Sequence, residues 1–148
     1  MTTAPATPPR GARPAPTASD VPAASPEPGC TLVVCRGCCC GDPVKHPRTD
    51  HTGQLRRLRA AAHASGGRLA VRTSACLGPC GQANLVVVRP SPAGRRQGGR
   101  PVWVGWVMDD ACVDDLLEWT AAGGPGLAEP PGALALQFVA RPRPRPHP

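Results

Sequence analysis

The sequence is poor in aromatic residues: its 148 positions hold one Phe, three Trp and no Tyr. A hydrophobic core must therefore consist mainly of Val, Leu and Ala. The scarcity of aromatic side chains also weighs against single-stranded nucleic acid as a ligand, because proteins of that class stack bases on aromatic rings. No helix-turn-helix, RNP or zinc-finger spacing occurs either, so the motifs do not favour nucleic acid.

Long apolar runs are also missing. No run approaches the ~20 apolar residues that a membrane span requires. The N-terminus lacks the basic region and following apolar stretch of a secretory signal. We therefore expect no membrane association and a cytoplasmic location. In that reducing compartment, the eight cysteines are expected to be metal ligands or redox thiols rather than disulfides.

Proline divides the chain into three parts. Eight of the 21 prolines lie in residues 1–29 and seven in residues 122–148, which leaves six for the 92 residues between. Residues 1–29 are rich in Ala, Pro, Thr and Ser and are predicted to be a disordered tail, because they can bury little apolar surface. Residues 123–148 end in alternating Arg and Pro and are predicted to be an extended tail. Residues 30–122 are predicted to form one small domain.

The charge of the chain is positive, with a formal net value of +7. Residues 30–121 hold twelve Lys or Arg but only seven Asp or Glu, and five of these acids lie between Asp109 and Glu118. The predicted domain is therefore basic apart from one acidic helix. A basic surface of this kind suits an acidic partner.

The apolar pattern predicts four strands and two helices in the order β-α-β-β-β-α. The strands are expected at about 31–34, 68–73, 84–89 and 102–107, and the helices at about 50–65 and 109–122. A helix between the first two strands makes them parallel neighbours, joined by a right-handed crossover. The last two strands are close enough in sequence to pair as an antiparallel hairpin. The sequence thus predicts an α/β fold, a four-stranded mixed sheet with flanking helices.

Two cysteine-rich loops follow the first two predicted strands. The first loop is Cys35-Arg-Gly-Cys-Cys-Cys40 and the second is Cys76-Leu-Gly-Pro-Cys80. Because parallel neighbours have their carboxyl ends at the same edge of a sheet, we expect the two loops to meet in space. Cysteine thiolates gathered in this way bind iron–sulfur clusters or zinc. The sequence therefore predicts a metal site at this edge.

These loops resemble those of the thioredoxin-like [2Fe–2S] ferredoxins. The intervals of four, 35 and three residues between the cysteines are similar to those in the ferredoxin-like peripheral subunit of respiratory NADH:quinone oxidoreductase. The resemblance covers about residues 30–122 and implies a thioredoxin-like fold, a [2Fe–2S] cluster and the carriage of single electrons, without enzyme activity. The cluster ligands that it implies are Cys35, Cys40, Cys76 and Cys80. The family does not require three adjacent cysteines, so Cys38 or Cys39 could replace Cys40.

Two other functions fit part of the pattern. The same four thiolates could hold a structural or sensing zinc ion, because zinc also favours two short cysteine pairs. Cys35 and Cys38 form a C-x2-C motif after a strand, as in thiol–disulfide oxidoreductases. That chemistry does not need Cys76 and Cys80, and the first loop does not lead directly into a helix.

The remaining cysteines and two of the histidines are expected to play no part in the site. Cys112 lies within the last predicted helix and suits a small core residue, and Cys30 is expected to be a free thiol at the tail boundary. His46 and His51 could suggest a Rieske-type centre, in which two histidines hold one iron. They are not paired with the cysteines, so we expect both to be surface residues.

The expected partner is an acidic redox protein, a reductase or an oxidoreductase. The basic residues beside the first loop that would contact it are Arg36, Lys45 and Arg48. A second basic stripe lies on the first predicted helix and consists of Arg56, Arg59 and His63. We expect it to be a solvated face, and the alternative is that it docks a partner. The sequence leaves open whether the domain forms a homodimer.

Overall fold

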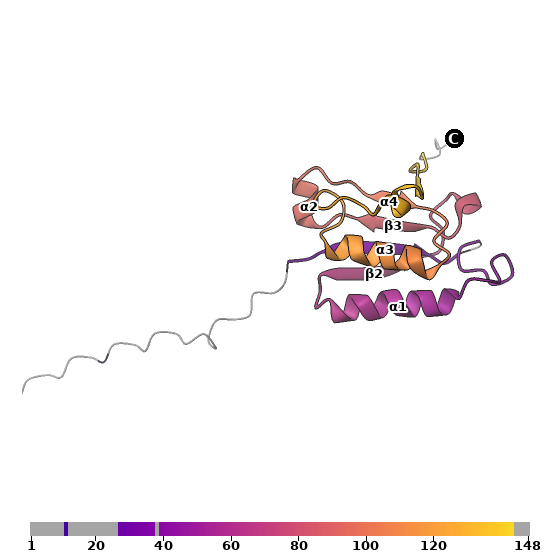
Figure 1. Ribbon diagram of the computed structural model, residues 1–148, viewed down its shortest axis with the longest axis horizontal. Helices are drawn as coiled ribbons and strands as arrows, with labels where there is room; N and C mark the ends of the chain where they lie inside the picture. The colour runs from indigo at the N-terminus through magenta and orange to yellow at the C-terminus, as the bar shows by residue number, and fades with distance from the viewer. Residues whose placement is uncertain (1–10, 12–26, 38, 144–148) are drawn as a thin grey trace, which may run out of the picture.

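The computed structural model describes residue 11 and residues 27–37 and 39–143, with only the backbone of Cys80. In Figure 1 the strands form one twisted sheet, α1 (His51–Ala64) runs along the side of β2, and α3 (Asp110–Ala121) crosses the face of the sheet. None of the described helices is long and apolar enough to cross a membrane.

The sheet has five strands in the order β2-β1-β3-β4-β5. The strands are β1 (Cys30–Cys35), β2 (Leu69–Ser74), β3 (Val86–Arg89), β4 (Val102–Val104) and β5 (Phe138–Val139). β1 and β2 are parallel, and every other pairing is antiparallel. The predicted crossover and the predicted β3–β4 hairpin are thus confirmed. The α/β thioredoxin-like arrangement is also confirmed, with one strand more than the four expected.

The two long helices begin at aspartates that cap them. Asp50 accepts a hydrogen bond from the amide of Gly53, and Asp109 accepts one from the amide of Cys112. These bonds satisfy amides that have no partner within the helix. The segment 90–100, between the two strands of the predicted hairpin, contains the short helix α2 (Pro92–Arg96), which Ser91 caps.

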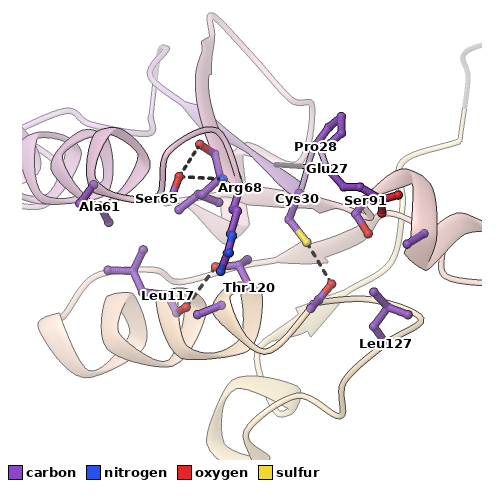
Figure 2. A pocket seen from close by; sticks show the side chains of 16 residues that line it. Glu27, Pro28, Cys30, Ala61, Ser65, Arg68, Ser91, Leu117, Thr120 and Leu127 are labelled. Atoms are coloured by element: carbon purple, nitrogen blue, oxygen red, sulfur yellow. Dashed lines mark hydrogen bonds between the residues drawn. The ribbon is translucent and has the colours of Figure 1, made fainter. Parts of the chain in front are cut away.

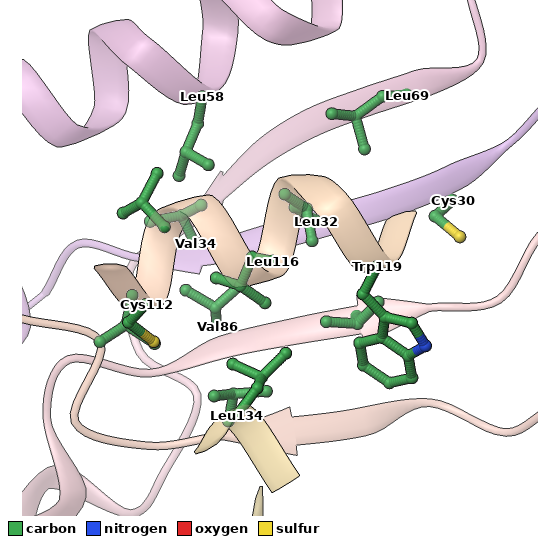
Figure 3. Close-up of a cluster of buried hydrophobic side chains, with 14 residues drawn as sticks. Cys30, Leu32, Val34, Leu58, Leu69, Val86, Cys112, Leu116, Trp119 and Leu134 are labelled. Atoms are coloured by element: carbon green, nitrogen blue, oxygen red, sulfur yellow. The ribbon is translucent and has the colours of Figure 1, made fainter. Parts of the chain in front are cut away.

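The main core lies between the sheet and the two long helices. Alternate residues of β1 and β3 point to this face, and Leu58 of α1 and Leu116 of α3 are fully buried against them. Figure 3 shows these side chains gathered over the sheet together with Trp119. Aliphatic residues dominate the cluster, as the lack of aromatics predicts. Cys30 and Cys112 are both buried in it, so Cys112 is a core residue as expected.

The C-terminal segment differs from the extended tail that the sequence predicts for 123–148. Its described part, 123–143, forms α4 (Gly132–Ala135) and the edge strand β5. Leu134 is fully buried, and the indole of Trp119 donates a hydrogen bond to the carbonyl oxygen of Ala128 at 2.8 Å. The folded unit therefore extends beyond residue 122. The predicted N-terminal tail lies outside the described residues except for Gly11 and 27–29.

Candidate metal centre

The two cysteine loops meet at the carboxyl ends of β1 and β2. The parallel register places Cys35 opposite Ser74. The amide of Arg36 donates a hydrogen bond of 2.8 Å to the carbonyl oxygen of Ser74. A Cβ atom on Gly37 would overlap the carbonyl oxygen of Ala75. The first loop is thus in backbone contact with the residues just before the second loop, and glycine at position 37 permits that contact.

Cys35 and Cys40 lie together in a small buried cluster with Ala83 and Leu85, and each is only 3% exposed. The amide of Leu85 donates a hydrogen bond to Cys40 Sγ at 3.4 Å. Burial, and to a lesser degree the adjacent Cys35 thiol, raise the pKa of Cys40 to about 12. A thiolate is costly at such a position unless a cation compensates it. A metal ion or cluster bound to both sulfurs would supply that compensation.

The second loop completes the site only in part. Leu77 packs against the buried cluster around Cys35, while the side chain of Cys76 is exposed. Cys80 opens the single-turn helix η1 (Cys80–Gln82), and Cys38 lies outside the described residues. Among the described side chains, no three His, Cys, Asp or Glu lie close enough together to hold a metal ion. The four-cysteine ligand set therefore stays a prediction.

The basic residues around the first loop play different parts. Arg36 is half-buried and donates hydrogen bonds of 2.9 Å to the carbonyl oxygen of Cys35 and 2.8 Å to Gln54 Oε1. Its guanidinium group therefore fixes the loop to α1. Lys45 and Arg48 are exposed, and Lys45 Nζ donates to Cys39 Sγ at 3.0 Å. Of the three residues expected to contact a partner, these two are exposed and Arg36 is half-buried.

A buried polar network below the first loop was missed by the sequence prediction. Asn84 is fully buried, and its Oδ1 accepts a hydrogen bond of 2.9 Å from the amide of Gly41. Its Nδ2 must then donate to His51 Nδ1, at 3.0 Å, so the ring proton of neutral His51 is on Nε2. The sequence contains one hint of this network, namely Asn84 directly before the apolar run 85–88. An amide side chain that is buried with such a run needs hydrogen-bond partners.

The network corrects the placement of His51. The prediction of a surface histidine is wrong, because the side chain is 8% exposed. Burial, and next the charge of Arg36, lower the pKa of His51, so the buried ring is neutral. His46 is half-buried, with its ring centroid 6.3 Å from that of His51.

Trp106 lies next to η1, the short helix that begins at Cys80 of the second loop. The prediction placed it within a strand at 102–107, but β4 ends at Val104. The backbone of Trp106 has a φ of 53°, a left-handed conformation that residues other than glycine rarely adopt. Hydrogen bonds from its amide to Gln82 (3.0 Å) and from Gln137 Nε2 to its carbonyl (2.9 Å) hold this conformation. Trp106 is 47% exposed, so part of a large apolar residue is open to solvent.

The opposite end of the sheet carries a cavity of about 780 Å³, drawn in Figure 2. Cys30 lies in its wall and is directed at the carbonyl oxygen of Gly123, at 3.4 Å. Burial raises the pKa of the Cys30 thiol, which makes the group a poor nucleophile. This cavity does not adjoin the cysteine loops and supplies no ligand to them.

Neither a protein-family model nor a curated protein sequence matches the chain. Among solved structures, a thioredoxin-like [2Fe–2S] ferredoxin from Aquifex aeolicus is similar over 79% of this chain and 96% of that chain, with 17% sequence identity and a TM-score of 0.47. At this level the similarity supports no argument about function. The topology of the sheet and the contacts of the two loops carry the interpretation below.

Proposed function

We propose that the protein binds a [2Fe–2S] cluster between its two cysteine loops and carries single electrons between protein partners. The observation that carries this proposal is the backbone contact between Arg36 of the first loop and Ser74 at the end of β2, just before the second loop. Cysteines from segments more than thirty residues apart thereby reach one edge of the sheet. The proposed ligands are Cys35, Cys40, Cys76 and Cys80, with Cys38 or Cys39 as alternatives to Cys40.

The residues of this chain would give such a cluster one buried and one exposed side. Cys35 and Cys40 would hold it on the protein side, where water is excluded. The amide of Leu85, which points at Cys40 Sγ, would stabilise the negative charge on sulfur. Cys76 is exposed and would face the partner. The cluster supplies one-electron redox chemistry, so no acid, base or nucleophile is required and the protein is proposed to be a carrier rather than an enzyme.

We further propose an acidic redox protein as the partner. Lys45 and Arg48 give the rim of the site a positive charge, and Val44 and Trp106 add exposed apolar surface. A small apolar contact surrounded by charges of one sign is typical of transient electron-transfer interfaces, in which charge orients the approach. Thiolate ligands of this kind suit a reducing location such as the cytoplasm.

The thiol–disulfide oxidoreductase is less well supported. Its first cysteine must present a thiolate to a substrate disulfide. Cys35 is 3% exposed and lies in an apolar cluster, so a disulfide could not reach its sulfur without movement of the loop. A zinc site with the same ligands is the remaining alternative, and metal analysis separates it from the cluster.

The decisive experiment is anaerobic purification followed by iron, sulfide and zinc assays, visible absorption and EPR of the reduced protein. We expect two irons and two sulfides per chain and a spin-half signal. Serine at Cys35 or Cys80 should abolish the signal, whereas Cys112→Ser should keep it, because Cys112 lies in the main core. One zinc per chain and no colour would contradict the electron-carrier proposal and identify a zinc protein instead.

A further inference from the structure

A pocket of about 650 Å³ lies beside the first cysteine loop, between Arg36 and the outer side of α1. Three arginines line it, namely Arg36, Arg56 and Arg59, together with His51 and His63. No aspartate or glutamate is among the residues that line it. We call this feature the basic pocket. Its outer residues include the stripe on α1 that the sequence left as a solvated face.

The arginines of α1 divide into two kinds. Arg57 forms ion pairs with Asp110 and Asp114 of α3 and so joins the two helices. Arg56 and Arg59 form no ion pair with any residue in the described part of the chain. They lie three positions apart and therefore on one face of the helix. Three guanidinium groups around one pocket repel each other, and a bound anion would remove that repulsion.

Two groups in the basic pocket are held in place before any ligand arrives. Arg36 is anchored by its hydrogen bonds to Cys35 and Gln54, and these leave part of its guanidinium fork unused. Gly41 makes room for it, since a Cβ there would lie 2.5 Å from Arg36 Cδ. His51 is more than nine-tenths buried, and its Nε2 has no hydrogen-bond partner among the described residues.

We propose that the basic pocket binds a phosphate dianion, either free or esterified to a small organic molecule. Guanidinium groups bind phosphate oxygens in pairs, and several arginines converging on one pocket are typical of phosphate recognition. The pocket includes Thr52 in the first turn of α1, where the helix dipole also favours an anion. Its volume lies in the range of small-molecule sites, and Leu55 and Ala60 supply an apolar wall. None of the side chains that would bind the anion is a proposed cluster ligand.

The test is isothermal titration calorimetry of the full-length protein with inorganic phosphate, adenosine 5′-monophosphate and adenosine. Saturable binding of phosphate or of the monophosphate, with none of adenosine, is expected. Arg59→Gln should weaken binding at least tenfold, since one charge-assisted pair of hydrogen bonds is lost. Arg89→Gln is the matched control, because Arg89 is exposed on β3 and does not line the pocket. Both residues are exposed, so their variants should unfold at the same temperature as the parent.

The outcomes separate the sources of the anion. Equal affinity for both phosphates supports a site for the free anion, and tighter binding of the monophosphate supports an organic ester. No saturable heat with either compound, or an equal loss in Arg89→Gln, would overturn the proposal. Because calorimetry does not depend on iron, a failure here leaves the electron-carrier proposal untouched, and the reverse also holds.

Discussion

At the scale of single residues, His51 couples the packing below the first cysteine loop to pH. Its pKa is lowered in the folded protein by burial and by Arg36, whereas the unfolded chain has a histidine pKa of about 6.5. The unfolded state therefore takes up a proton first as the pH falls. Stability from neutral His51 is present above about pH 6.5 and is lost below it. We expect the urea midpoint to drop between pH 7.5 and pH 5.5.

The matched comparison is His51→Asn, whose side-chain oxygen can replace Nδ1 as the acceptor for Asn84. This variant should lose less stability than the parent over that pH range. His63→Asn, at an exposed position, should behave like the parent. Parallel pH profiles for His51→Asn and the parent would show that other groups dominate.

Asn84 is the centre of the same network and makes a separate prediction. Asn84→Leu keeps a similar volume but leaves the Gly41 amide and His51 Nδ1 without their partner in a buried place. Each lost partner costs about 1–3 kcal/mol. Urea unfolding should therefore show a lower free energy of unfolding. A variant as stable as the parent would mean that water satisfies both groups.

The residues of the site could be predicted where their spacing along the sequence determines their position in the fold. The two loops could be assigned to the ends of parallel strands because each follows a short apolar run, and their contact is confirmed. The Gly41–Asn84–His51 network could not be predicted, since its members meet only through the tertiary fold. The same reason explains His51 itself: one histidine near a helix start looks like a surface residue until Asn84 is placed beside it.

At the scale of elements, the C-terminal segment is expected to contribute to stability. Leu134 of α4 is fully buried, and β5 pairs with β4. A chain that ends at residue 122 would expose this part of the core and leave β4 as an edge. We expect it to unfold at a lower temperature than a chain ending at residue 143. Circular dichroism on heating measures the difference, and equal midpoints would contradict the packing role of α4.

A point substitution in α4 measures how much this helix contributes to the free energy of unfolding. Leu134→Ala should destabilise the full chain by about 2–5 kcal/mol through loss of burial and the cavity left behind. Leu136→Ala is the matched control, because Leu136 is 86% exposed. An equal effect of the two substitutions in urea unfolding would show that the segment does not pack as described.

Elements with strong local signals were predicted well. α1 and α3 have aspartate caps and apolar spacing at helical periodicity, and both lie close to their expected ends. β5 has two residues and α4 has four, which is too short for periodicity to develop. Both also lie in a segment rich in Pro and Gly, whose composition suggests an extended chain. Their structure arises from contacts with Trp119 and β4, which no local pattern encodes.

At the scale of the whole molecule, the net charge of +7 should govern the approach of a redox partner. Charges that steer an encounter act over about a Debye length, which falls from roughly 14 Å at 50 mM salt to about 4 Å at 500 mM. The rate of electron transfer with an acidic protein should therefore fall markedly over this range, by roughly tenfold. Stopped-flow absorbance of the proposed cluster measures the rate. A basic partner should show the opposite trend.

Charge-reversal variants locate the surface on which this steering acts. Lys45 and Arg48 are exposed beside the first cysteine loop, so the double variant Lys45→Glu, Arg48→Glu should slow the reaction at low salt and flatten its salt dependence. Arg95→Glu and Arg96→Glu together make the same change in net charge on α2. α2 packs against the turn at Pro125, away from the loops. If both double variants slow the reaction equally, net charge steers the partner and the rim of the site does not; a larger effect at Lys45 and Arg48 places the docking surface at the cysteine loops.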